Sequence, residues 1–162
     1  MKETQKSAAI DVLGLGNALV DVLARAEEAF LIENGLAKGA MTLIEADDAR
    51  ALYQKIGPAV EVSGGSAANT IAGVAGFGGA AAYIGKVADD TLGDIFSHDI
   101  KALGVQFEGA RLAGADTGRC IIVVTPDAQR TMSTFLGASS SLSVNDVDEA
   151  LTRSARIVYL EG

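Results

Sequence analysis

Short apolar runs alternate with amphipathic segments along most of the chain. Residues 8–15, 80–84 and 156–160 are apolar runs with the length and character of buried strands. Residues 91–103 place apolar side chains at helical spacing, and Gly104 follows them as a helix-ending glycine. This alternation of strand and helix predicts an α/β domain. We expect its sheet to be doubly wound and mostly parallel, with helices on both faces.

Four more segments have helical character. Apolar positions recur on one stripe of residues 46–56, and Gly57-Pro58 ends this segment. Residues 67–77 are rich in small side chains, so we expect a buried helix there with Ser66 as its N-cap. The four predicted helices are residues 27–34, 46–56, 67–77 and 145–154.

Several short apolar segments have no helix between them. They lie in the regions 20–23, 40–44 and 106–135. In the last region, the β-branched run 117–124 precedes a turn at Pro126-Asp127 and then a second strand, which predicts a hairpin. We expect these strands to form a small second sheet beside the main one.

Composition and charge narrow the class of protein. Apolar residues make up 49% of the 162 positions and charged residues 21%, which excludes disorder as the main state. The net charge of −8 and the lack of a basic patch argue against nucleic-acid binding. No apolar run is long enough to cross a membrane, and Met1–Ser7 lacks the apolar core of a secretory signal. Since the single cysteine, Cys120, suits a reducing compartment, we expect a soluble, acidic, cytoplasmic protein.

A glycine-rich turn at Gly64-Gly65 joins a predicted strand to a predicted helix. Glycines there let a ligand approach the backbone, and the N–H groups of the first helical turn bind oxygen-rich ligands. Asn69 in that turn offers both a donor and an acceptor, as the hydroxyl pair of a sugar requires. The alternative is a tight turn whose glycines serve packing alone.

The segment from Gly14 to Asp21 follows the first strand. It resembles the dinucleotide fingerprint G-x-G-x-x-G, but Leu19 replaces the third glycine, so dinucleotide binding loses its main support. Asp21 is a lone carboxylate among apolar residues. At the end of a strand it is able to accept hydrogen bonds from two hydroxyl groups, and the alternative is a solvated turn residue.

Metal-dependent and thiol chemistry have little support in the sequence. The single cysteine, Cys120, and the single histidine, His98, lie in different predicted elements. One residue of each kind does not make a zinc site or a Cys/His pair. The acidic clusters Asp89-Asp90 and 146–149 stand near predicted helix starts, where the helix dipole accounts for them.

Taken together and in order, these segments resemble the N-terminal half of the ribokinase-like (PfkB) carbohydrate kinase family. Residues 64–72, continued by 85–93, are similar to the first signature of that family. Residues 16–21 resemble the opening segment of its adenosine kinase branch and of related sugar kinases. Residues 117–120 and the strand that begins at Arg130 are similar to its later hairpin.

The resemblance implies a ribokinase-like fold, in which a small β-sheet lid covers the substrate. The lid strands would come from about 17–23, 40–44 and 106–135. Each residue that the resemblance assigns to substrate binding lies in one of the segments just named or in the strand 40–44. Asp21 and Asn17 would bind substrate hydroxyls, Gly64, Gly65 and Asn69 would hold the sugar ring, Met41 and Thr42 would belong to the lid, and Cys120 and Ile122 would line the pocket.

The resemblance also implies a reaction, the transfer of the γ-phosphate of ATP, with Mg²⁺, to a hydroxymethyl group of a ribose-like sugar or adenosine. The second signature of the family, which carries the catalytic base, is not in this sequence, and most of the ATP pocket belongs with it. We therefore expect an N-terminal, substrate-binding part of a kinase, cut within its central sheet. It should hold no catalytic base or metal ligand and be inactive by itself. The alternative is a non-catalytic sugar- or nucleoside-binding module, or a homodimer formed through the lid.

Overall fold

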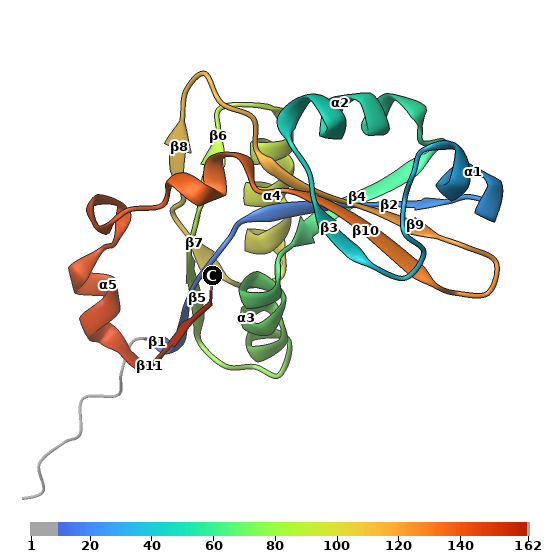
Figure 1. Ribbon diagram of the computed structural model, residues 1–162. Coiled ribbons are helices and arrows are strands. Elements are labelled where there is room, and N and C mark those ends of the chain that lie inside the picture. Colours follow the sequence, from blue (N-terminus) through green and yellow to red (C-terminus); the bar gives the residue numbers. More distant parts are fainter. Residues whose placement is uncertain (1–9, 162) are drawn as a thin grey trace, which may run out of the picture.

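The computed structural model describes residues 10–161, and Figure 1 shows two sheets joined side by side. Met1–Ser7, expected not to form a secretory signal, and the first two residues of the predicted strand 8–15 lie outside the described residues. The main sheet has four strands in the order β11-β1-β5-β7, and every neighbouring pair is parallel. This confirms the predicted parallel sheet. Its strands are β1 (Ile10–Leu15), β5 (Ala81–Ile84), β7 (Gln106–Phe107) and β11 (Ala155–Leu160).

Helices cover both faces of the main sheet, because successive side chains of a strand point to opposite sides. On one face, Tyr83 packs with Ile71 of α3 and Phe96 of α4 in the larger apolar core. On the other face, Ala82 and Leu13 pack in a smaller core, against which α5 lies. The helices are α3 (Ser66–Gly76), α4 (Thr91–Ala102) and α5 (Glu149–Ser154).

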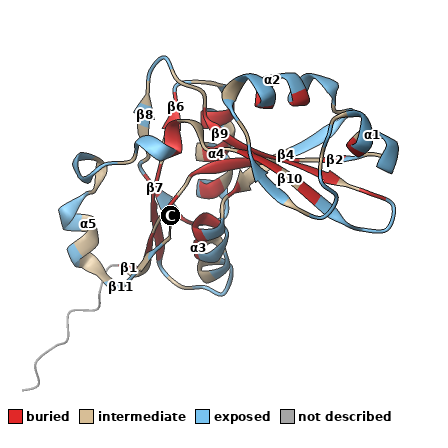
Figure 2. Ribbon diagram, in the orientation of Figure 1, coloured by how far each residue is buried: buried red, intermediate tan, exposed pale blue. Residues whose placement is uncertain are grey.

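The second sheet has five strands in the order β3-β10-β9-β2-β4. The antiparallel pair β9 and β10 is the predicted hairpin, while β2 runs parallel to β9 and antiparallel to β4. One face of the sheet is buried under α2 and α4 (Figures 1 and 2). The strands are β2 (Leu19–Arg25), β3 (Met41–Leu43), β4 (Ala59–Gly64), β9 (Gly118–Val124) and β10 (Arg130–Phe135), and the outer helices are α1 (Glu28–Glu33) and α2 (Ala46–Lys55).

One part of the expected second sheet lies elsewhere. Residues 106–107 form β7 of the main sheet, because the ring of Phe107 packs against Phe96 and Tyr83, with ring centroids 5.2 and 6.0 Å away. Strand β8 (Ala110–Leu112) pairs with β6 (Lys86–Ala88) in a separate two-stranded sheet. Strand β4, which was not expected there, forms one edge of the second sheet.

Two helix starts also differ from the prediction. Helix α3 is preceded by Gly65 at φ +94° as its N-cap, so Ser66 is the first helical residue rather than the cap. The predicted helix 145–154 is divided, because Asp148 accepts a hydrogen bond from Leu151 N and starts α5 there. Two short 3₁₀ turns precede it, η1 (Gly137–Ser141) and η2 (Val144–Asp146).

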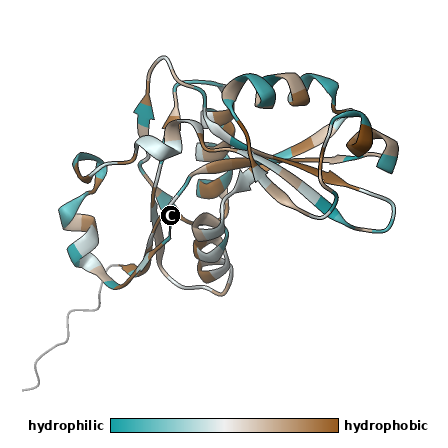
Figure 3. Cartoon of the chain, viewed as in Figure 1, coloured by the Kyte–Doolittle hydropathy of each residue, from teal (hydrophilic) through white to brown (hydrophobic). Residues whose placement is uncertain are grey.

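Apolar residues are concentrated in the strands between the helix layers, and the outer surfaces of α2 and α5 are mostly hydrophilic (Figure 3). Among residues 10–161, no helix combines the length and apolar character needed to cross a membrane. The two sheets meet where β1 passes into β2 and where β4 passes into α3. The candidate site lies at this junction.

Candidate functional site

Close backbone packing at glycines forms the junction between the two sheets. A β-carbon on Gly64 would overlap the carboxylate of Asp21, and one on Gly65 would overlap the carbonyl oxygen of Asn17. Gly65 also has a φ of +94°, a conformation that side chains other than glycine rarely adopt. Both glycines of the predicted turn are therefore required by packing, and they place the turn directly against Asn17 and Asp21.

Asp21 lies in the middle of β2 and is half-buried. Burial raises the pKa of its carboxyl group, and the positive charge of Arg130 opposes part of that rise. No hydrogen bond from the described part of the chain, residues 10–161, shifts this pKa. A partly desolvated carboxylate with free lone pairs is suited to accept hydrogen bonds from a ligand.

A row of aligned residues crosses the second sheet beside Asp21. Cys120 of β9 pairs with Asp21, and Thr134 of β10 pairs with Cys120. The Thr134 hydroxyl donates to Cys120 Sγ at 3.2 Å. Burial raises the pKa of the Cys120 thiol, the Thr134 bond lowers it, and the charge of Asp21 raises it further. Ile122, two residues along β9, shares this face and is buried.

The two candidates of β3 point to opposite faces of the second sheet. Met41 pairs with Met132, which pairs with Ile122, so Met41 lies on the Asp21 face with 57% of its surface exposed. Thr42 pairs with Ser133 and lies on the other face, where it lines a cavity of about 320 Å³ beside α2. The structure thus does not bring Thr42 together with the other candidates, because neighbouring residues of a strand alternate between faces.

A small hollow of about 190 Å³ extends the junction toward the main sheet. Its lining includes Asn17 and Gly65, together with Glu161, which directly follows β11. The Glu161 carboxylate accepts hydrogen bonds from the Ser66 hydroxyl and, at 2.9 Å, from the Tyr159 hydroxyl. Sequence reasoning missed Glu161. The available signal was that it follows a strand parallel to β1, so it lies at the same sheet edge as Asn17.

Asn69 lies one helical turn beyond Gly65, and its backbone N–H donates to the Gly65 carbonyl at 2.9 Å. Its side chain is exposed, in the first turn of α3. The structure therefore places Asn69 in the same strand–helix connection as the glycine pair. Asn17 and Gly65 lie in the two connections that meet at the junction, and Asp21, Gly64 and Asn69 lie in the elements that these connections join.

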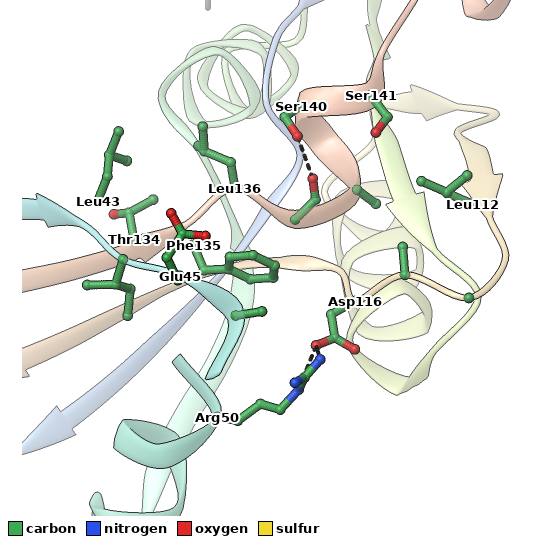
Figure 4. Close-up of a pocket in the computed structure, with 16 residues that line it drawn as sticks. Leu43, Glu45, Arg50, Leu112, Asp116, Thr134, Phe135, Leu136, Ser140 and Ser141 are labelled. Carbon is green, nitrogen blue, oxygen red and sulfur yellow. Dashed lines mark hydrogen bonds and ion pairs between the residues drawn. The ribbon is translucent and has the colours of Figure 1, made fainter. Parts of the chain in front are cut away.

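A cavity of about 490 Å³ adjoins this face at Thr134 and Leu43 (Figure 4). Leu136 and Phe135 add apolar wall, and η1 and the loop before β9 form its far side. At its lower rim, Arg50 binds the Asp116 carboxylate through Nε at 3.0 Å and through Nη2 at 2.8 Å. The lining is thus mainly apolar, with the Arg50–Asp116 ion pair at one edge and polar groups from Glu45, Ser140 and Ser141.

The parallel main sheet with helices on both faces, and the second sheet beside it, give the chain the ribokinase-like class of α/β fold. Residues 39–162 match the family model of the pfkB family carbohydrate kinases, and the chain belongs to that family.

Solved structures of similar fold include two from bacteria. The crystal structure of an adenosine kinase from Sinorhizobium meliloti is 54% identical, with a TM-score of 0.87. That of a probable sugar kinase from Rhizobium etli is 48% identical, with a TM-score of 0.88. Each match covers 94% of this chain and 47% of the solved chain.

Curated relatives include an ATP-dependent ribose-1-phosphate kinase of Halopiger xanaduensis, 34% identical over 98 residues. Adenosine kinase 2 of Arabidopsis thaliana is 26% identical over 161 residues. These matches cover 60% and 93% of this chain, but 33% and 46% of the relatives. The chain therefore spans half or less of the length of the kinases that it matches.

Proposed function

We propose that this chain forms the acceptor-binding part of an ATP-dependent kinase. The acceptor would be a nucleoside such as adenosine, or a ribose-like sugar, phosphorylated on its hydroxymethyl group. Membership of the pfkB family supports the reaction class. The adenosine kinase and probable sugar kinase among the similar structures support the two acceptor classes. The carboxylate of Asp21 packed against Gly64 is the observation that carries the proposal.

Each group at the junction has a role that follows from its chemistry. Asp21 accepts hydrogen bonds from a pair of ring hydroxyls, and its desolvation strengthens those bonds. The absence of side chains at Gly64 and Gly65 lets the sugar ring approach the backbone. Asn17 and Asn69 supply amide donors and acceptors at the rim. Glu161 adds a second carboxylate for a further hydroxyl.

The apolar part of the second-sheet face would contact the rest of the acceptor. Cys120 and Ile122 are buried there and Met41 is exposed at the edge strand. Apolar walls with a few polar groups are typical of sites for small organic ligands. A nucleoside would cover this surface more fully than a free sugar would.

The phosphate donor is not assigned to residues of this chain. Among residues 10–161, no three His, Cys, Asp or Glu side chains are arranged to hold a metal ion. Mg²⁺ in phosphoryl-transfer sites is usually held by one or two carboxylates together with waters and substrate phosphates. The proposal therefore concerns acceptor binding alone.

Calorimetric titration of the 162-residue chain with adenosine, ribose and fructose tests the proposal. We expect binding of adenosine or ribose, and loss of that binding in Asp21→Ala. The control is His98→Ala, an exposed position on α4, which should bind as the unmodified chain does. Equal affinity in Asp21→Ala, or no binding of any of the three ligands, would overturn the proposal.

A second assay tests the alternative of a non-catalytic module. The chain is incubated with ATP, Mg²⁺ and the ligand that binds, and the products are separated by chromatography. A phosphorylated product would exclude a non-catalytic sugar- or nucleoside-binding module, whereas binding without product is expected both of that module and of a kinase part that is inactive by itself. This alternative is tested because the chain covers 47% of each of the two similar solved chains.

A further inference from the structure

Helix α4 holds two strands of the second sheet by side-chain carboxylates, one on each side of β2. Asp99 Oδ2 accepts a hydrogen bond from the backbone N–H of Ser63 in β4 at 2.7 Å. Asp90 Oδ2 accepts one from the backbone N–H of Thr117, just before β9, at 2.8 Å. In each case the bonded amide belongs to the residue directly before a glycine, Gly64 in β4 and Gly118 in β9.

Those two glycines face each other across β2. Leu19 pairs with Gly64 on one side and with Gly118 on the other. Neither glycine has room for a side chain, because a β-carbon on Gly118 would overlap the Leu136 carbonyl and one on Gly64 would overlap Asp21. The carboxylates of α4 therefore fix the backbone one residue before the two closest packing points of the junction.

Asp99 holds its strand without also capping α4, whereas Asp90 does both. Asp90 also caps α4, since its Oδ1 accepts from Gly93 N at 2.8 Å, so its loss would disturb the helix itself. Asp99 lies near the other end of α4, three residues after the buried Phe96 and one before the buried Ile100. Asp99 is half-buried beside this apolar stripe. Aspartate is a weaker helix former than most residues, and α4 does not need the Asp99 side chain as a cap.

The Ser63 N–H donates to Asp99 and not to a neighbouring strand. β4 is an edge strand with a single neighbour, β2, so amides on its outer side have no strand to pair with. A hydrogen bond to an ionised carboxylate is stronger than one between neutral groups. Asp99 thus satisfies an otherwise open edge amide and fixes the strand that leads into Gly64-Gly65.

We propose that Asp99 is a positioning residue, which sets the spacing between the Gly64-Gly65 turn and Asp21 by holding Ser63. This inference rests on the proposed acceptor-binding function of the junction. Without the Asp99 carboxylate, the pairing with β2 is left to hold the end of β4, and the turn is held less firmly against the Asp21 carboxylate. Acceptor affinity then falls although no group that touches the acceptor has changed.

The test measures adenosine binding by calorimetry in three variants of the full chain. Asp99→Ala should weaken binding by about tenfold, since a hydrogen bond to a charged group is worth at least that factor. Asp99→Asn keeps an oxygen that accepts from Ser63 and should recover most of the affinity. Ile100→Val, buried on the same helix, should lower the melting temperature without changing the affinity.

The outcomes separate this inference from the proposed function. If the unmodified chain does not bind adenosine, ribose or fructose, the proposed function is wrong. If it binds adenosine and Asp99→Ala binds equally well, or Ile100→Val is weakened as much, the positioning role is wrong. Amide hydrogen exchange gives a readout without ligand, because Ser63, Gly64 and Gly65 should exchange faster in Asp99→Ala. Unchanged exchange at these three amides would overturn the inference by itself.

Discussion

The carboxylate of Asp21 lies against the α-carbon of Gly64, so closely that a β-carbon there would overlap it. The two residues are on neighbouring antiparallel strands, β2 and β4, and Leu19 rather than Asp21 is the direct partner of Gly64. The Asp21 side chain therefore leans along the strand, over the start of the glycine turn. This contact joins the one carboxylate of β2 to the turn that enters α3.

Gly64→Ala should abolish the fit between the turn and Asp21. The added methyl group must displace either the carboxylate or the backbone, so we expect at least about tenfold weaker binding of adenosine or ribose. The matched control is Gly73→Ala within α3, where a β-carbon meets no atom within 4 Å. That control should keep its affinity and gain stability of roughly 0.5–1 kcal/mol in thermal unfolding. Unchanged affinity in Gly64→Ala would contradict a role in binding for the close contact between Gly64 and Asp21.

Asp21→Asn should change how stability depends on pH. Burial raises the pKa of Asp21 in the folded chain above its ordinary value of 3.8. The folded chain therefore binds this proton more tightly than the unfolded chain does. The stability associated with the protonated form is present below 3.8 and is lost as the pH rises through the raised pKa of the folded state. Asparagine does not ionise, so the variant should gain stability relative to the unmodified chain as the pH rises from 3.8 through the raised pKa of the folded state. Denaturant unfolding at several pH values measures this difference, and a difference that stays constant with pH would contradict it.

Cys120 should react slowly with iodoacetamide at neutral pH. Burial, together with the charge of Asp21, raises the pKa of its thiol above the ordinary value of 9.0, and the reactive thiolate is correspondingly scarce. As the single cysteine of the chain, it gives one mass increment that mass spectrometry follows directly. A ligand bound beside Asp21 should slow the reaction further. Reaction as fast in the folded chain as in the urea-unfolded chain would contradict the burial of this thiol.

Tyr83→Phe should leave the fold intact and increase its stability. The Tyr83 hydroxyl is buried and has no hydrogen-bond partner among residues 10–161. Removing a buried polar group without a partner relieves a desolvation cost of about 1 kcal/mol, while the ring keeps its contacts with Phe96 and Phe107. A higher melting temperature is the expected result. Tyr83→Leu, which removes the ring, should lower it, and a loss of stability in Tyr83→Phe would show that the hydroxyl has a partner.

Ile157→Lys should reduce self-association of the 162-residue chain. β11 is an edge strand of the main sheet, and Ile157, Val158 and Leu160 on it are 59%, 42% and 69% exposed. Open strand edges with apolar side chains pair with other chains, and a lysine on the edge opposes this. Light scattering at increasing protein concentration measures the effect. Ile32→Lys is the control, because Ile32 is 79% exposed on α1 and belongs to no strand, so this change should have little effect.

Local sequence patterns determined most of the elements and the centre of the site. Apolar runs gave β1, β5 and β11 of the main sheet but not β7, and the β-branched run with its turn gave the hairpin of β9 and β10. The glycine pair at 64–65 is confirmed as a close-packed turn, and Asp21 lies directly beside it. These features are predictable because periodicity, turn chemistry and glycine conformation act over fewer than about ten residues.

Tertiary structure alone decided which elements meet and which face each side chain takes. Alternation along a strand separates Met41 from Thr42, but the pairing of β3 with a strand some 90 residues later decides that Met41 is the one on the Asp21 face. Glu161 reaches the junction because β11 pairs with β1, at the other end of the sequence. The bond from Ser63 to Asp99 depends on how α4 packs across β4. Sheet register and helix packing depend on which apolar faces are buried together in the common core, and a local sequence pattern does not predict that.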